Sequence, residues 1–166
     1  MSPRLERRTP WKFLVLQGFA RTNSVFLGAQ SPSVDRTAPV IGGFADVLAD
    51  DVAFEAPGGV QGRGKKACAE SYGAWFEAFP DAHVEVHRVH FSGDVAVEEG
   101  TFTGTHNGIL HGPAGDVPPT GRPVSIDYVN VLRFKDGKHV SFSLTFDRLA
   151  MLEQLGLISP PAPGGR

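Results

Sequence analysis

From residue 81 onward, apolar and polar residues alternate with a period of two, which predicts strands that bury one face. The expected strands cover residues 83–91, 95–106, 124–134 and 139–146. Asp136-Gly137 between the last two is typical of a two-residue hairpin turn. Gly93-Asp94 plays the same part between the first two.

Earlier in the chain the apolar spacing is helical. The strongest pattern is Cys68, Tyr72, Trp75, Phe76 and Phe79, which predicts a helix ended by a proline. A helix starting near residue 10 and a second one over 40–49 are also expected. Between them and the strong helix, residues 52–55 form a short strand candidate and residues 57–64 a loop.

A final helix follows the last strand. Asp147 can cap its first turn, and Gly156 can end it. Helices followed by an antiparallel meander predict an α+β fold in which a curved antiparallel sheet wraps around helices. We expect an N-terminal arm over 1–36, one domain over 37–158 and a disordered tail over 159–166.

Composition narrows the classes of function. The 166 residues suit one domain, and the net charge of −2 without a basic stripe argues against a dedicated nucleic-acid or membrane-surface protein. The single cysteine, Cys68, excludes an internal disulfide and any multi-thiolate metal site, so a reducing cytoplasm is the simplest setting. No apolar run is long enough to span a bilayer.

Strand alternation sorts the faces of the sheet. In the last strand Val140, Phe142, Leu144 and Phe146 alternate with Ser and Thr and should face inward. The inward row of 124–134 is apolar except for Asn130. In 95–106 two rows compete, and we take the row with Glu98, Phe102, His106 and two glycines as inward.

The inward polar residues form a candidate site. Glu98, His106 and Asn130 would project toward one apolar space, and burial would raise the pKa of Glu98 and suit it to general acid–base work. The alternatives are that Glu98 faces solvent, that His106 is a hydrogen-bonded loop residue, and that Asn130 pairs with backbone at a bulge. The expected lining residues are Tyr72, Trp75, Phe79, Phe102, Tyr128, Phe142, Leu144 and Phe146.

Three other patterns are weaker. Residues 59–66 nearly match a phosphate-binding loop, but a lysine follows the motif lysine where Ser or Thr is needed. Among His83, His87 and His90, alternation places His90 on the opposite face, which disfavours a metal site. No Gly-x-Ser-x-Gly motif supports a nucleophilic enzyme.

The outer face of the predicted sheet carries an apolar patch. Val95 and Val97 lie on one strand and Val129 and Val131 on another. A monomer would leave this patch in water, so we expect a homodimer packed sheet against sheet.

Several motifs together resemble the SnoaL-like polyketide cyclases of the nuclear-transport-factor-two-like superfamily. The resemblance runs from about residue 44 to 156. It implies a cone-shaped α+β fold, a deep pocket inside the curved sheet, a dimer and no cofactor. It also implies that a pocket carboxylate removes a proton beside a carbonyl, after which the enolate closes a ring by aldol addition. The motifs are Phe79-Pro80-Asp81, Gly104-Thr105-His106-Asn107-Gly108, Pro118-Pro119-Thr120-Gly121-Arg122, Arg133-Phe134-Lys135-Asp136-Gly137-Lys138 and Leu152-Glu153-Gln154-Leu155-Gly156.

The chain departs from that family at its acid–base positions. The family aspartate falls at Leu144, and the neighbouring His-Trp pair becomes Phe142-Ser143. Glu55 replaces a histidine after the first strand, and Glu98 stands at a usually aliphatic position.

Three functions follow. The first is a cyclase or isomerase acting on an apolar carbonyl compound, with Glu98 or Glu55 as base and His106 and Asn130 steadying an enolate. The second is a non-catalytic binding protein for a hydrophobic small molecule. The third, an epoxide hydrolase resembling the limonene epoxide type of the same superfamily, ranks last. That chemistry uses an Asp-Arg-Asp arrangement with Arg and Asp two residues apart on a strand, and no Arg-x-Asp occurs in this sequence.

Overall fold

The structure, a computed structural model, describes residues 47–112 and 115–159. The predicted N-terminal arm, its helix near residue 10 and most of the helix over 40–49 lie outside these residues, as does most of the tail. Within the described part, no helix combines the length and apolar character needed to cross a membrane.

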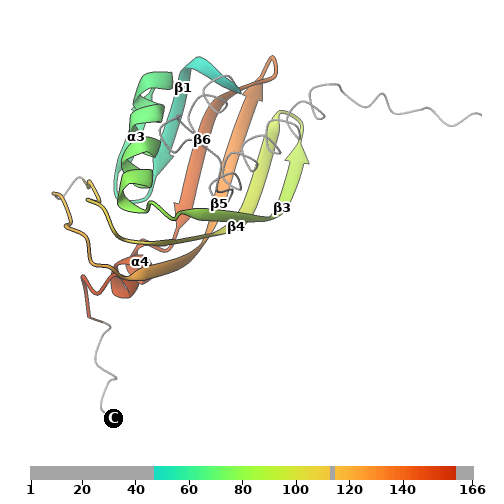
Figure 1. Cartoon of the computed structure of the whole chain (residues 1–166). Helices are drawn as coiled ribbons and strands as arrows, with labels where there is room; N and C mark the ends of the chain where they lie inside the picture. Colours follow the sequence, from blue (N-terminus) through green and yellow to red (C-terminus); the bar gives the residue numbers. More distant parts are fainter. Residues whose placement is uncertain (1–46, 113–114, 160–166) are drawn as a thin grey trace, which may run out of the picture.

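Six strands form one curved sheet in the order β2-β1-β6-β5-β4-β3 (Figure 1). Neighbours are antiparallel except β1 and β6, which run parallel, so the expectation of a wholly antiparallel sheet is wrong at this pair. Parallel neighbours need a long crossover, and here β2 to β5 lie between them in the chain. The strands are β1 Leu48–Ala56, β2 Val60–Arg63, β3 His83–Ser92, β4 Val95–Thr105, β5 Pro123–Lys135 and β6 Lys138–Phe146.

Within residues 47–112 and 115–159, two helices flank the sheet (Figure 1). α3 (Lys65–Ala78) follows β2 and packs beside β1, while the short α4 (Arg148–Gln154) follows β6 at one end of the sheet. As predicted, the side chain of Asp147 accepts a hydrogen bond from the backbone N–H of Ala150, at 3.0 Å. An α+β fold with a curved sheet is therefore confirmed.

Two predictions before α3 are wrong. The helix expected to continue to residue 49 has ended at Val47, and Leu48 begins β1, where it is 1% exposed. The expected loop over 57–64 contains β2, which pairs antiparallel with β1. Gly58 and Gly59, both with positive φ, make the turn between the two strands.

Two β-bulges interrupt the alternation. In β3 the register shifts between Val86 and Arg88, so His90 lies on the outer face with His83, not opposite it as alternation predicted. In β6 the shift makes His139, not Val140, the inward partner of Phe134. One extra residue exchanges the two faces of everything beyond it, so periodicity carried across a bulge gives the wrong face.

The core divides into two parts on the inner face of the sheet. We call the first part the α4 cluster, and the partly buried Trp75, Leu144 and Phe146 pack against it. Its buried members are Ala78, Phe79, Ala82, Phe102, Leu110, Val124, Ile126, Tyr128, Met151 and Leu155. We call the second part the β1 cluster, and the partly buried Tyr72 packs against it. Its buried members are Leu48, Val52, Phe54, Cys68, Ala96, Leu132, Phe134 and Phe142.

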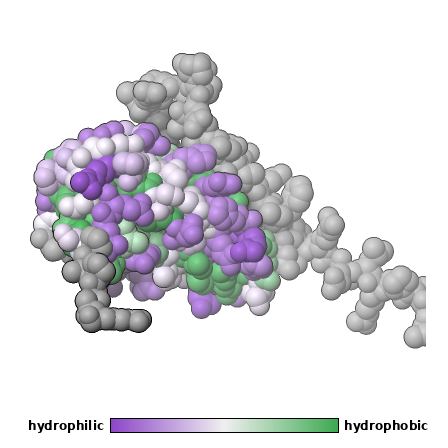
Figure 2. Space-filling model, turned by 90° about the horizontal axis from the view of Figure 1, so that it is seen from below, coloured by the Kyte–Doolittle hydropathy of each residue, from purple (hydrophilic) through white to green (hydrophobic). Residues whose placement is uncertain are grey.

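The surface seen from the α4 end mixes hydrophilic residues with apolar areas (Figure 2). Leu149 on α4 is 61% exposed, and Leu157 just after it is also exposed. Single exposed leucines are ordinary on protein surfaces, so they carry no functional argument.

Candidate functional site

One cross-strand row of the sheet brings polar side chains to the inner face. Glu98 of β4 pairs with Asn130 of β5, which pairs with Leu144 of β6, while Val89 of β3 lies on the other side of Glu98. This row, which we call the polar row, crosses the sheet between the two core clusters. The predicted inward orientation of Glu98 holds, because its side chain is 8% exposed.

Glu98 has one neutral partner. The hydroxyl of Tyr128, on β5, donates a hydrogen bond to Oε1 of Glu98 at 2.6 Å, a length typical of strong O–H···O⁻ bonds. Both side chains are buried. No described cation pairs with Glu98, so its charge is balanced by this hydrogen bond alone within residues 47–112 and 115–159.

Burial and the tyrosine act on Glu98 in opposite directions. Burial raises the pKa of the Glu98 carboxyl, and the hydrogen bond from Tyr128 lowers it by less. The pKa of Tyr128 is itself raised, first by burial and then by the nearby Glu98 carboxylate. Tyr128 therefore keeps its proton and acts as a donor, while Glu98 is the group able to gain and lose one.

Asn130 adds an acceptor next to the carboxyl. Its Oδ1 is buried and has no hydrogen-bond partner among the described residues, although nearly all buried polar atoms have one. The alternative prediction, that the Asn130 amide pairs with the backbone at a bulge, does not hold for its oxygen. A polar group of a ligand would satisfy it.

Helix α3 passes over this part of the sheet. Tyr72 packs against the β1 cluster and Trp75 against the α4 cluster, so the helix crosses from one cluster to the other above the polar row. The ring of Tyr72 lies 5.9 Å from that of Phe142. Burial, followed by Cys68 and Glu98, raises the pKa of Tyr72, so a second phenol lies within the electrostatic reach of Glu98.

His106 does not join Glu98 and Asn130. It comes eight residues after Glu98, immediately beyond the end of β4, which corresponds to about 26 Å of extended chain at roughly 3.3 Å per residue. There it is fully buried, and its Nδ1 lies 3.1 Å from the hydroxyl of Thr120 and accepts the backbone N–H of Thr120 at 3.3 Å. The prediction that all three polar residues meet is wrong for His106, which holds the loop before β5.

Glu55 also lies elsewhere. Phe54, the neighbour of Glu55 on β1, is buried on the inner face, so Glu55 points to the outer face and is exposed. There it accepts a hydrogen bond from Ser143 at 2.6 Å. The prediction that Glu55 is an alternative base inside the sheet is therefore wrong. Strand alternation could have shown this, because the adjacent Phe54 faces inward.

The eight predicted lining residues divide between the two clusters. Ring contacts link Trp75 with Phe79, Phe102 and Phe146 at centroid distances of 5.0, 5.4 and 6.1 Å. Phe79, Phe102 and Phe142 are buried in the core, whereas Trp75 and Phe146 are half-buried, like Tyr72 and Leu144. The four half-buried side chains, together with Asn130, are therefore the ones available to a ligand.

Two grooves open on the outer face. The larger, about 750 Å³, runs across β2, β1, β6 and β5 beside Glu55 and Arg133, and the smaller, about 450 Å³, lies near Asp81 and Gln154. Neither contains Glu98, Tyr128 or Asn130. In the described segments no three His, Cys, Asp or Glu side chains gather as metal ligands would.

The fold places the chain in a class. A structure from Jannaschia sp. CCS1, assigned provisionally as a SnoaL-like polyketide cyclase, matches with a TM-score of 0.73 and 21% identity over 95% of this chain and 100% of its own. IdmH from Streptomyces antibioticus, provisionally a polyketide cyclase, matches at 0.63 and 24% over 85% and 97%. An NTF2-like protein of unknown function from Burkholderia pseudomallei matches at 0.65 and 19% over 86% and 97%. These likenesses define an NTF2-like α+β fold.

The family is narrower than the fold. The family model for SnoaL-like polyketide cyclases matches residues 40–155, and the chain belongs to this family. Comparison with curated proteins finds none that matches. The expected family and fold are thus confirmed, and a small-molecule role of the cyclase or isomerase type is supported.

Proposed function

We propose that this protein is a cofactor-independent cyclase or isomerase that uses Glu98 as its acid–base group on an apolar carbonyl compound of the polyketide type. The observation that carries the proposal is the buried Glu98–Tyr128 pair, with the unpartnered Oδ1 of Asn130 beside it. A carboxyl with a raised pKa is what proton abstraction near neutral pH requires.

The proposed reaction begins at a C–H bond next to a carbonyl group. The Glu98 carboxylate takes the proton, and the electron pair of the C–H bond becomes part of an enolate. In a cyclase the enolate carbon then bonds to a second carbonyl carbon of the same molecule, and protonated Glu98 returns its proton to the new alkoxide. In an isomerase it returns the proton to another carbon.

In the proposed reaction the Nδ2–H donors of Asn130 bind the enolate oxygen, while its unpartnered Oδ1 accepts a hydrogen bond from a hydroxyl group of the substrate. The Asn130 amide carries both donors and an acceptor, and it neighbours Glu98 directly in the polar row. An N–H donor aimed at a developing oxyanion in a site shielded from water is an effective way to stabilise it.

The position of the carboxyl agrees with the family's use of an inner-face acid. The resemblance places the family aspartate at Leu144, which lies in the same row as Glu98, two strands away. At a strand spacing of about 4.8 Å the two positions are roughly 10 Å apart. We infer that the acid–base group serves the same inner face of the sheet from a different strand.

The test follows proton abstraction directly. Wild type and Glu98→Gln are incubated in D₂O with an aromatic polyketide that carries a 1,3-diketone, and deuterium uptake and ring closure are followed by mass spectrometry. We expect Glu98→Gln to lose at least about 100-fold in rate, as general-base losses do, while binding survives. Glu55→Gln, a carboxylate on the outer face, is the matched control and should keep the wild-type rate.

Equal rates in wild type and Glu98→Gln would contradict the proposal. Binding without any turnover would favour the second candidate, a non-catalytic binding protein. The observation behind that candidate is Leu144, since leucine cannot transfer a proton. Native mass spectrometry of the purified protein would then identify the class of retained ligand.

We further propose that the outer face forms a homodimer. Val97 and Val131 are direct cross-strand neighbours there, Val95 flanks them, and Val129 is 39% exposed. Apolar side chains gathered on a sheet face are typical of surfaces that pack against a second copy.

A further inference from the structure

The inner face of β4 lacks a side chain where Tyr128 lies. Gly100 is the direct cross-strand partner of Tyr128. A Cβ at Gly100 would lie 2.7 Å from the Tyr128 oxygen and 2.8 Å from its Cε1, closer than real Cβ contacts. The phenol ring therefore occupies the space of a missing side chain and reaches Glu98, two residues away on β4.

The β3 bulge lies directly beside this glycine. Val86 pairs with Gly100 and Arg88 with Glu99, so His87 is the extra residue. The bulge brings the backbone carbonyl oxygen of Glu85 to the place where a Gly100 Cβ would stand. Bulges often occur next to functional sites, where they change the direction of a neighbouring group.

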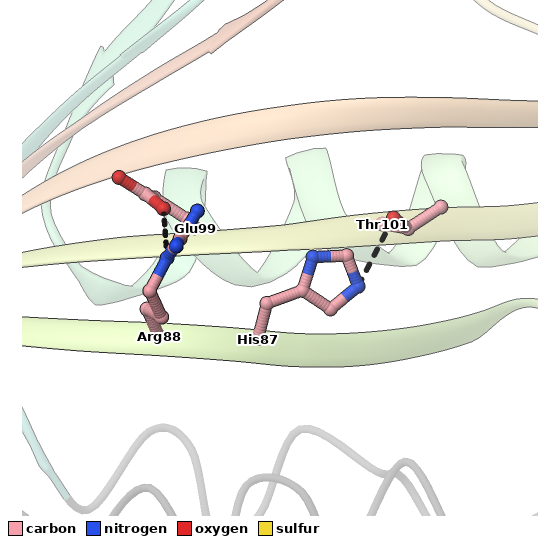
Figure 3. Close-up of polar contacts among 4 residues, drawn as sticks. All are labelled: His87, Arg88, Glu99 and Thr101. Carbon is pink, nitrogen blue, oxygen red and sulfur yellow. Dashed lines mark hydrogen bonds and ion pairs between the residues drawn. The ribbon is translucent and has the colours of Figure 1, made fainter.

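Outer-face contacts hold both residues of the bulge (Figure 3). Arg88 Nε donates to Oε2 of Glu99 at 2.8 Å, and His87 Nε2 lies 3.3 Å from the hydroxyl of Thr101. The Thr101 hydroxyl donates its proton to Asp127 at 2.6 Å, so it accepts from His87. Glu99 and Thr101 are the two chain neighbours of Gly100, so the contacts brace the strand on both sides of the glycine.

We propose that Gly100 is a positioning residue, and that the braced bulge behind it keeps the Tyr128 hydroxyl on Glu98. The consequence for turnover rests on the proposed function, but the placement of Tyr128 does not. Any side chain at position 100 would displace the phenol, and a relaxed bulge would let β4 move beneath it.

The test measures the pKa of Glu98 directly. Its carboxyl carbon is titrated by ¹³C NMR in wild type, Gly100→Ala, Tyr128→Phe and the double variant. Because the Tyr128 hydrogen bond lowers the pKa of Glu98, both single variants should raise that pKa. The double variant should shift it no further than Tyr128→Phe alone. If the protein turns over a substrate, the acid limb of its pH–rate profile should shift to higher pH in both single variants. The value of kcat/KM should fall about ten-fold, the size expected for one hydrogen bond to a charged group.

Gly104→Ala is the matched control. Gly104 shares the strand and face of Gly100, but its Cβ would meet Phe79 at 3.2 Å and not Tyr128. It should perturb packing and leave the titration of Glu98 unchanged. An unshifted Glu98 in Gly100→Ala, or additive shifts in the double variant, would overturn the proposal.

A second variant decides the matter if Gly100→Ala does not fold. Thr101→Val keeps the shape of the side chain and removes the two hydrogen bonds of the Thr101 hydroxyl, to His87 and to Asp127. A raised pKa of Glu98 in this variant supports the proposal, and an unchanged one overturns it. Thr103→Val, on the same face of β4, is its control. If even the wild type turns nothing over, the proposed function fails while the Glu98 titration still tests the placement.

Discussion

At the scale of single residues, Glu98 makes folding depend on pH. Burial raises its pKa above the ordinary value of 4.5, so the folded protein keeps this proton at pH values where the unfolded chain has lost it. The free energy of unfolding therefore falls as the pH rises from about 4.5 through the folded pKa, and it stays lower above that point.

Glu98→Gln should remove this pH dependence. We expect the variant to gain stability over wild type at about pH 7 and to lose that gain near pH 4, where both forms are neutral. Urea unfolding at several pH values measures the difference, with Glu55→Gln as the exposed control. The same difference at both pH values would show that Glu98 does not titrate within this range.

Residue identities predicted part of the site. The two glycines beside Glu98 in its row indicated the inward face, and that orientation is confirmed. The hydrogen bond from Tyr128 was not predicted, because periodicity assigns a side chain to a face but not to a partner. The sequence also does not show that the Tyr128 ring fills the space beside Gly100, which only the structure reveals.

At the scale of elements, α4 depends on its cap. Asp147 satisfies the N–H of Ala150, and the helix then places Met151 and Leu155 in the α4 cluster. Gln154 also forms two hydrogen bonds with the backbone of Ser125 on β5. The cap therefore contributes both to the helix and to its contact with the sheet.

Asp147→Ala should destabilise the protein by about 1 kcal/mol, the usual loss for an N-cap. Asp147→Asn keeps an acceptor oxygen and should lose much less. Thermal unfolding followed by circular dichroism measures both variants. Equal losses would mean that the charge of Asp147, not its hydrogen bond, stabilises the helix.

Elements governed by local rules were predicted well. The presence of α3 and its end before Pro80, the bounds of the four later strands to within one residue, and the hairpin at Asp136-Gly137 agree with the sequence analysis. The failures were β2, the start of β1, the parallel β1–β6 pair and the bulge at His87. The start of β1 and the parallel β1–β6 pair depend on a strand distant in the chain, whereas β2 and the bulge at His87 depend on the register with a neighbouring strand; local periodicity encodes neither.

At the scale of the whole molecule, the valine patch tests the proposed assembly. Val131→Lys places a charge in the middle of this patch, opposite Val97, and burying it without a partner is costly. We expect the variant to sediment as a monomer at micromolar concentration while the wild type sediments as a dimer. Asp94→Lys, in the exposed β3–β4 turn, should leave the dimer intact. A monomeric wild type would contradict the proposed interface.

The sequence by itself determined the α+β class, the family and the inward face of Glu98, since these follow from periodicity, turn chemistry and local motifs. Only the tertiary structure decided which polar residues meet. Strand register brings Glu98 beside Asn130, whereas His106 lies beyond the far end of β4, about 26 Å of extended chain from Glu98. The physical reason is that alternation defines a face, whereas a site also requires the register between strands and the space that one side chain leaves for another.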